Sequence, residues 1–130
     1  MGSNAVLIVD DEKNIRMTVS RCLETLELGT DTAVNGEEAL DKLKQKDYGA
    51  LLLDLKLPGM DGMEVLRQVR DAWPATRVII ITAHGTIDSA VEAMKLGASD
   101  FIQKPFTPEE IRTVVSRVLK QDGAEIPKIN

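Results

Sequence analysis

The chain has 130 residues, of which 43% are hydrophobic and 28% are charged, and its formal net charge is −5. This length suits a single domain with one core, and the composition is that of a folded globular protein rather than a disordered or membrane protein. The acidic balance argues against direct contact with nucleic acid, because gripping its backbone requires Lys and Arg clustered on one face.

The apolar runs of the sequence are too short to cross a bilayer, and no charged leader precedes them. We therefore expect a cytoplasmic protein that makes no membrane contact. The single cysteine, Cys22, excludes an internal disulfide and a cysteine metal cluster. We interpret it as a packing residue, since it lies on the apolar stripe of a predicted helix.

Five short runs rich in aliphatic and β-branched residues are predicted strands. They are Ala5–Asp10, Asp31–Val34, Ala50–Asp54, Arg77–Thr82 and Asp100–Gln103. Amphipathic segments alternate with them, which gives five βα units. The third and fourth runs are apolar without alternation, which is typical of strands covered by helices on both faces. Together these patterns predict an open α/β sandwich with a parallel sheet, because the chain is too short for an eight-unit barrel.

Three of the predicted helices carry an apolar stripe that we expect to cover the sheet. The stripes are Ile15, Val19, Cys22, Leu23 and Leu26; Ile87, Ala90, Val91 and Met94; and Ile111, Val114, Val115 and Val118. Thr107 with Glu110 has the spacing of a capping box at a helix start, and Asp61 with Glu64 forms a similar arrangement.

Glycines and a change in pattern predict where helices and the domain end. Gly29 and Gly97 are predicted helix stops. Residues 121–130 lose the apolar period, so we interpret them as a C-terminal tail or the start of a linker. Residues 1–3 look in part like a cloning remnant. The expected domain therefore covers residues 4–120.

Ligands of open α/β sheets bind beyond the carboxyl ends of the strands, so the side chains there are candidate site residues. These are Asp10, Asp11 and Glu12 after the first strand, Asp54 at the end of the third, Thr82 at the end of the fourth and Lys104 after the fifth. Carboxylates this close stay ionised only beside a cation, and oxygen ligands in an open pocket favour Mg²⁺.

Phosphoryl transfer is the chemistry that this set of residues predicts. Thr82 and Lys104 add a hydroxyl and an ammonium, which can hold phosphate oxygens beside a metal. A carboxylate in that setting can act as the nucleophile and become an aspartyl phosphate. Asp54 is our candidate, because it stands alone at the end of the most central apolar strand.

Four segments together resemble a response-regulator receiver domain. They are Val9-Asp10-Asp11-Glu12, Leu53-Asp54-Leu55-Lys56-Leu57-Pro58-Gly59-Met60-Asp61-Gly62, Ile81-Thr82-Ala83 and Lys104-Pro105-Phe106. The resemblance implies a flavodoxin-like (βα)5 three-layer sandwich with strand order 2-1-3-4-5. The residue patterns by themselves predict a parallel sheet but not that order.

The resemblance also implies a role for each site residue. Asp54 is the phosphoacceptor, and it binds Mg²⁺ directly together with Asp11. Asp10 acts on the metal through water, and the backbone carbonyl of Lys56 is a further ligand. Lys104 binds a phosphoryl oxygen, and its peptide bond to the following proline is expected to be cis.

A conformational switch is a second implication of the resemblance. Thr82 also binds the phosphoryl group and is drawn toward it, and Phe101 turns inward behind it. The alternative for Phe101 is a packing role only. His84, the single histidine, is interpreted as a polar loop residue that together with Lys56 tunes the phosphate lifetime, rather than as a catalyst.

The partners implied are a sensor histidine kinase, which donates the phosphoryl group, and an output domain or downstream effector. The face formed by the fourth helix, fifth strand and fifth helix is expected to change partners, with a phosphorylation-dependent homodimer as one form. The stretch from Ala83 to Ala98, with Asp100-Phe101, most resembles the nitrogen-regulatory class of transcriptional activators. Such a domain catalyses only its own phosphorylation and dephosphorylation.

Two other classes of protein share this type of fold. A flavodoxin-like cofactor protein needs a Gly/Ser/Thr-rich loop after the first strand, where this chain carries three acids. An aspartate phosphatase places a second aspartate two residues after the nucleophile, where this chain has Lys56. The remaining alternative is an interaction module that is not phosphorylated, a class that usually shows a broken acidic pocket.

Overall fold

The structure is a computed structural model that describes residues 5–83 and 87–121. Five strands and five helices alternate along this part of the chain. Their bounds are β1 Val6–Val9, α1 Lys13–Glu24, β2 Thr30–Ala33, α2 Gly36–Gln45, β3 Ala50–Asp54, α3 Gly62–Ala72, β4 Arg77–Thr82, α4 Ile87–Lys95, β5 Asp100–Gln103 and α5 Pro108–Gln121. None of the described helices is long and apolar enough to cross a membrane.

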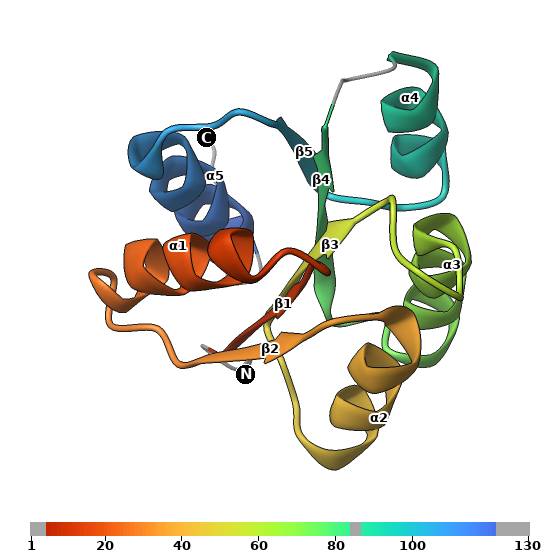
Figure 1. Cartoon of the computed structure of the whole chain (residues 1–130). Helices are drawn as coiled ribbons and strands as arrows, with labels where there is room; N and C mark the ends of the chain where they lie inside the picture. Colours follow the sequence, from red (N-terminus) through yellow and green to blue (C-terminus); the bar gives the residue numbers. More distant parts are fainter. Residues whose placement is uncertain (1–4, 84–86, 122–130) are drawn as a thin grey trace, which may run out of the picture.

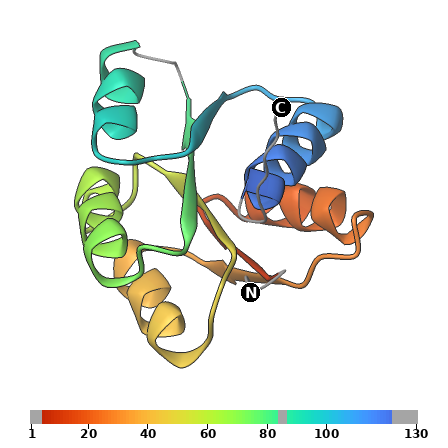
Figure 2. The ribbon, with the colours of Figure 1, turned by 180° about the vertical axis from the view of Figure 1, so that it is seen from behind.

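The strands form one parallel sheet in the order β2-β1-β3-β4-β5. Helices α1 and α5 cover one face, and α2, α3 and α4 cover the other (Figures 1 and 2). This is the three-layer (βα)5 sandwich that the receiver-domain resemblance implies, with the expected strand order. The carboxyl ends of β1, β3 and β4 therefore lie beside one another at the centre of one sheet edge.

The core explains why the central strands are apolar without alternation. Along β3, Leu51 and Leu53 pack on the side of α2, α3 and α4, whereas Leu52 packs on the side of α1 and α5. Every residue of β1 and β3 is buried. A strand that is covered on both faces gains burial from each side chain, so the apolar pattern is continuous.

Three of the five predicted strands have the expected bounds, and the first two differ at their ends. Strand β1 is shorter than Ala5–Asp10, and β2 begins and ends one residue earlier than predicted. Val34 leaves the ladder because its N–H donates to the carboxylate of Glu38 (2.7 Å). That hydrogen bond belongs to the start of α2, where Asn35 in turn accepts from the Glu38 N–H (2.8 Å).

The apolar stripes of α1 and α5 cover the sheet as predicted, with Val19, Leu23, Ile111 and Val115 buried. Cys22 is buried beside them, which agrees with a packing role.

The prediction for α4 is wrong in part, because Val91 and Met94 are exposed rather than packed on the sheet. The buried face of α4 consists instead of Ala90 and Ala93. Ala93 lies beside Ala90 on the helix, so the apolar band is wider than the face that meets the sheet, and the 3.6-residue period does not show which part of the band is buried. The side chain of Ile87 lies outside the described residues.

Helix caps confirm one predicted capping box and only half of the other. The Thr107 hydroxyl accepts from the Glu110 N–H (3.1 Å), and the Glu110 carboxylate accepts from the Thr107 N–H (2.8 Å). Asp61 caps α3 by accepting from the Met63 N–H at 3.5 Å. Glu64 accepts from Gln68 (3.1 Å) instead of closing a reciprocal box.

Helix α4 ends as predicted, whereas α1 does not. Gly97 has a positive φ of 109°, the left-handed geometry that favours glycine after a helix. After α1 that geometry falls on Glu27, with a φ of 61°, and not on Gly29. The N–H groups of Leu28 and Glu27 donate to the carbonyls of Leu23 and Glu24, so the chain has already left the helix before the glycine.

Candidate functional site

The candidate site residues meet at the carboxyl edge of the sheet because the register aligns the strand ends. Val9 pairs with Leu53, so the residues that follow them, Asp10 and Asp54, are neighbours. Thr82 ends β4 on the other side of β3. Lys104 follows β5, and its N–H donates to the Thr82 carbonyl (2.8 Å). Four positions spread over the chain thus converge on one pocket.

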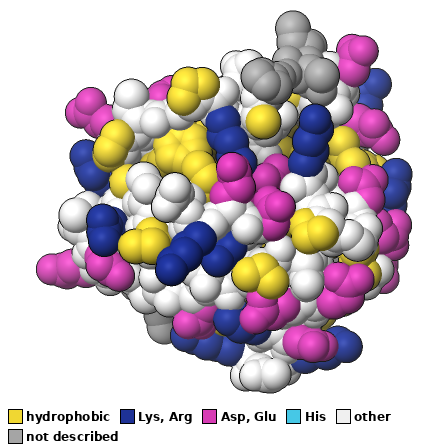
Figure 3. All heavy atoms as spheres, viewed as in Figure 1, with side chains coloured by type: hydrophobic (Ala, Val, Ile, Leu, Met, Phe, Trp, Pro, Cys, Tyr) yellow, Lys and Arg dark blue, Asp and Glu magenta, His cyan; other side chains and the backbone are white. Residues whose placement is uncertain are grey.

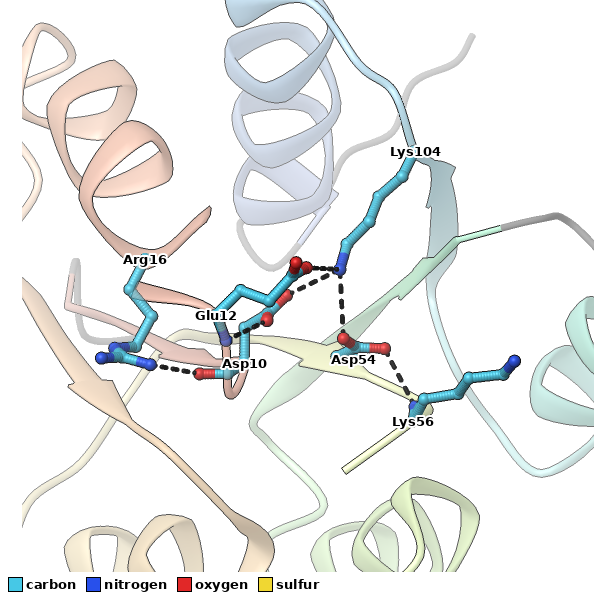
Figure 4. Close-up of polar contacts among 6 residues, drawn as sticks. All are labelled: Asp10, Glu12, Arg16, Asp54, Lys56 and Lys104. Carbon is cyan, nitrogen blue, oxygen red and sulfur yellow. Dashed lines mark hydrogen bonds and ion pairs between the residues drawn. The ribbon is translucent and has the colours of Figure 1, made fainter. Parts of the chain in front are cut away.

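The Lys104 ammonium is the centre of this pocket (Figure 4). Its Nζ lies 3.0 Å from Asp10 Oδ2, 3.1 Å from Asp54 Oδ2 and 3.2 Å from Glu12 Oε1. The side chain of Lys104 is 13% exposed and that of Asp10 is 0% exposed. Charges so far removed from water interact strongly, because little solvent is left to screen them.

Burial and neighbouring charges shift the pKa values of Asp10 and Lys104. Burial raises the pKa of Asp10 above its ordinary value, although the Glu12 N–H and Lys104 act in the opposite direction. For Lys104, burial by itself lowers the pKa, but the contacts with the Asp10 and Asp54 carboxylates outweigh it and the pKa is raised. Lys104 is therefore a fixed cation at neutral pH.

The backbone holds both buried carboxylates in place. Asp54 Oδ1 accepts from the Lys56 N–H (2.9 Å), and Asp10 Oδ1 accepts from the Glu12 N–H (2.8 Å). The Arg16 side chain donates from Nη1 to the Asp10 carbonyl (2.8 Å), which ties α1 to the end of β1. Each carboxylate thus keeps one oxygen for the backbone and turns the other toward Lys104 (Figure 4).

Three carboxylates form a group that fits a metal ion. Ligand oxygens of Asp10, Asp11 and Asp54 all lie within 4.8 Å of one another. Among the described residues, Asp10 Oδ2 is a buried oxygen with an ion pair but no hydrogen bond. On the face of the molecule seen in Figure 3, acidic side chains gather near the middle, with basic side chains beside them. A buried oxygen without a hydrogen bond and a set of hard ligands suit a divalent cation such as Mg²⁺.

Comparison with known proteins identifies the family. Residues 6–116 match the response regulator receiver domain family. The chain belongs to that family. The receiver domain is 40% identical to the DNA-binding transcriptional regulator NtrC of Escherichia coli K12 over 92% of its own length and 25% of the relative. It is also 40% identical to the transcriptional regulatory protein ResD of Bacillus subtilis, over 89% and 48% of the two chains.

Solved structures agree with this assignment. The receiver domain of NtrX from Brucella abortus is 35% identical, with a TM-score of 0.84, over 88% of this chain and 97% of that one. The chemotaxis response regulator CheY4 of Vibrio cholerae is 30% identical, with a TM-score of 0.83, over 91% and 99%. The receiver domain therefore has the CheY-like fold and is similar to NtrC- and NtrX-type regulators, the nitrogen-regulatory class that the sequence indicates. It spans about a quarter to a half of the curated relatives NtrC and ResD.

The remaining predicted residues occupy distinct places around the pocket. Thr82 is buried at the end of β4, and Phe101 on β5 is exposed. The Lys56 side chain is exposed and points away from the carboxylates, so only its backbone is near them (Figure 4). The peptide between Lys104 and Pro105 is cis, as the resemblance implies. His84 lies outside the described residues.

For two residues that contact the pocket, the sequence does not predict the contact that the structure shows. Glu12 was recognised as one of three acids after β1, but not as a partner of Lys104. Arg16 was not singled out, because nothing in its sequence context shows that its side chain reaches back to β1. The only sequence signal is its position in the first turn of α1, close to the acidic loop.

Proposed function

We propose that this receiver domain accepts a phosphoryl group on Asp54 from the phosphohistidine of a sensor histidine kinase. The reaction is Mg²⁺-dependent, and it switches the domain between two conformations that control an output domain. The observation that carries the proposal is the contact of Lys104 with Asp54 (3.1 Å) inside a group of three carboxylates. A lone buried ion pair needs no further acids beside it, whereas phosphoryl transfer requires them to hold a metal.

Charge balance supports a divalent cation in the pocket. Asp10, Asp11 and Asp54 carry three negative charges and Lys104 carries one positive charge, which leaves a formal excess of two negative charges. Mg²⁺ would neutralise that excess and the charge that develops on the transferred group. Asp11 and Asp54 would hold it directly, Asp10 through water, and the Lys56 carbonyl would complete the protein ligands.

The residues of the chain supply positioning and charge in the transfer itself. A carboxylate oxygen of Asp54 attacks phosphorus, the bond from phosphorus to the imidazole nitrogen breaks, and the released imidazole takes up a proton. Lys104 faces the same carboxylate and neutralises the oxygens of the group in transit. Asp54 is held for attack because its other oxygen accepts from the Lys56 N–H.

The proposed switch uses Thr82 and Phe101. Thr82 stands at the end of β4 beside β5, which carries Phe101. A phosphoryl group on Asp54 gives the Thr82 hydroxyl a new acceptor, and the space that it leaves can take an inward aromatic ring. The exposed Phe101 corresponds to the state before this change.

The partners follow from the family and from the names of the relatives. NtrC and ResD are transcriptional regulators, so we assign this receiver domain to the control of transcription through an output domain in the cytoplasm. Contact with DNA would belong to that output domain. The functional unit is residues 4–120, followed by a tail or linker at 121–130, with residues 1–3 in part a cloning remnant. A homodimer that forms on phosphorylation is part of the proposal.

The alternative function is an interaction module that is not phosphorylated. The intact set of Asp10, Asp11, Asp54 and Lys104 argues against it, because such a module gains nothing from buried acids that lower its stability.

Intact mass after incubation with acetyl phosphate, with and without Mg²⁺, tests the proposal. We expect one hydroxylamine-labile phosphate that requires Mg²⁺ and is lost in Asp54→Asn. The matched control is Asp41→Asn, which removes an exposed carboxylate on α2 and should label like the parent. A folded parent that takes up no phosphate would favour the interaction module, whereas equal labelling of Asp54→Asn would overturn the assignment of Asp54 as the acceptor.

A further inference from the structure

Lys104 has one partner that belongs neither to the phosphoacceptor nor to the proposed metal ligands. Its Nζ donates to Glu12 Oε1 at 3.2 Å, across 92 positions of the chain. Glu12 is the first residue after the acidic pair, and its side chain is 62% exposed. It therefore lies at the mouth of the pocket rather than inside it.

The local structure leaves the Glu12 side chain free to make this contact. Glu12 occupies the N-cap position of α1 with an extended backbone (φ −91°, ψ 119°), yet its side chain makes no capping hydrogen bond. Its N–H is held by Asp10 Oδ1 (2.8 Å). The backbone is thus fixed beside the pocket while the carboxylate turns to Lys104 (Figure 4).

An ammonium has three N–H donors, and Lys104 has three carboxylate partners. Glu12 and Asp54 accept hydrogen bonds from it, and Asp10 is an ion-pair partner at 3.0 Å, so a phosphoryl oxygen that binds Lys104 competes with these contacts. Asp10 is fully buried, and if Lys104 leaves, its carboxylate loses the one cationic partner that it has among the described residues. Glu12 is the partner that water can solvate once it is released, so it is the least costly to displace.

We propose that Glu12 is a positioning residue: it holds the Lys104 ammonium before phosphorylation and competes with the phosphoryl oxygens for it. The inference rests on the proposed function of Asp54 and adds a residue that sets how strongly the phosphorylated state is favoured. Exposed ion pairs of this kind change an equilibrium constant by about 1.5- to 5-fold. Removing the Glu12 charge should tighten the binding of a phosphoryl analogue by that factor.

The probe is beryllium fluoride, titrated at saturating Mg²⁺ and followed by NMR chemical shifts. We expect Glu12→Gln to lower its Kd by about 1.5- to 5-fold relative to the parent. Glu24→Gln, at the exposed end of α1, is the matched control for net charge and should leave the Kd unchanged. Urea unfolding of each variant separates a change in affinity from a change in stability.

Two further variants distinguish positioning from a general effect of charge. Glu12→Asp keeps the charge, but its side chain is one methylene shorter. If Glu12 acts by positioning Lys104, the Kd of this variant should be lowered like that of Glu12→Gln. If only the negative charge near the pocket matters, the Kd should equal that of the parent. In a Lys104→Met background, positioning predicts that Glu12→Gln has no effect on the Kd. Where Lys104→Met binds too weakly to measure, Glu12→Asp decides.

The outcomes separate the inference from the proposed function. A parent that binds the analogue, with Glu12→Gln unchanged or with Glu12→Asp like the parent, overturns the role of Glu12 alone. An equal effect of Glu12→Gln with and without Lys104 overturns it as well. A folded parent that does not bind the analogue at all overturns the proposed function and this inference together.

Discussion

Replacing Tyr48 with phenylalanine should remove one hydrogen bond while keeping a buried ring. The Tyr48 hydroxyl donates to Asp31 Oδ2 at 2.6 Å, and Lys46 pairs with the same oxygen at 3.1 Å. This cluster lies at the amino edge of the sheet, before β3, so it is remote from the pocket at the carboxyl edge. Tyr48→Phe therefore tests the fold without touching the proposed chemistry.

The size of the effect follows from the charge and exposure of the acceptor. A hydrogen bond to a charged group is worth about 1.5–3 kcal/mol. The Asp31 side chain is 37% exposed, so water replaces part of the lost interaction, and we expect about 1 kcal/mol in the free energy of unfolding. For a domain of this size that corresponds to roughly 3–4 °C in Tm.

The stabilisation from the hydrogen bond between Tyr48 and Asp31 should decrease at both acidic and alkaline pH. The Tyr48 hydrogen bond lowers the pKa of Asp31 below its ordinary value of 3.8, so its stabilisation is present above pH 3.8 and is lost as the pH falls through the lowered value. Burial, with Asp31, raises the pKa of Tyr48 above 10.0, so the hydroxyl contributes below pH 10 and its contribution is lost as the pH rises through the raised value. The difference between parent and Tyr48→Phe should be constant from about pH 5 to 9.

Urea unfolding at pH 7 and at pH 3.5 measures the difference, and labelling of Asp54 provides the functional control. We expect a difference of about 1 kcal/mol at pH 7 that shrinks at pH 3.5, with labelling unchanged. A variant as stable as the parent at pH 7, or a difference that grows on acidification, would refute this reasoning.

Three further predictions concern the site loop, a helix cap and the lysine. Gly62→Ala should lower the free energy of unfolding by more than about 2 kcal/mol, because a Cβ there would lie 2.6 Å from Leu55 Cα. Gly29→Ala, whose Cβ would have nothing within 4 Å, should leave the stability unchanged or raise it slightly. Equal urea midpoints for the two variants would contradict this. Thr107→Ala should cost about 1 kcal/mol through loss of the α5 capping box, and an unchanged Tm would argue against it. Lys104→Ala should still permit some labelling but weaken the chemical-shift response, which shifts equal to the parent's would disprove.

The sequence predicts the fold correctly where the pattern of apolar and capping residues is compatible with only one local structure. The apolar runs of β3 and β4 and the cap at Thr107 were predicted correctly, because each depends on neighbours in the sequence. The buried face of α4 was not, since its apolar band is wider than the face that packs on the sheet, and only the folded structure shows that Ala90 and Ala93 are the buried part. The end of α1 at Glu27 was missed because a left-handed glutamate has no signature in the sequence.

The sequence by itself determined the acids and the lysine of the site, since each stands at a recognisable strand end. Only the tertiary structure decided that Lys104 binds Glu12 and that Arg16 holds the carbonyl of Asp10. The contact between Lys104 and Glu12 joins residues 92 positions apart, and both side chains are long enough to reach several partners. Local pattern identifies which groups lie at the edge of a sheet, but which of them touch depends on strand order, register and side-chain direction in the folded chain.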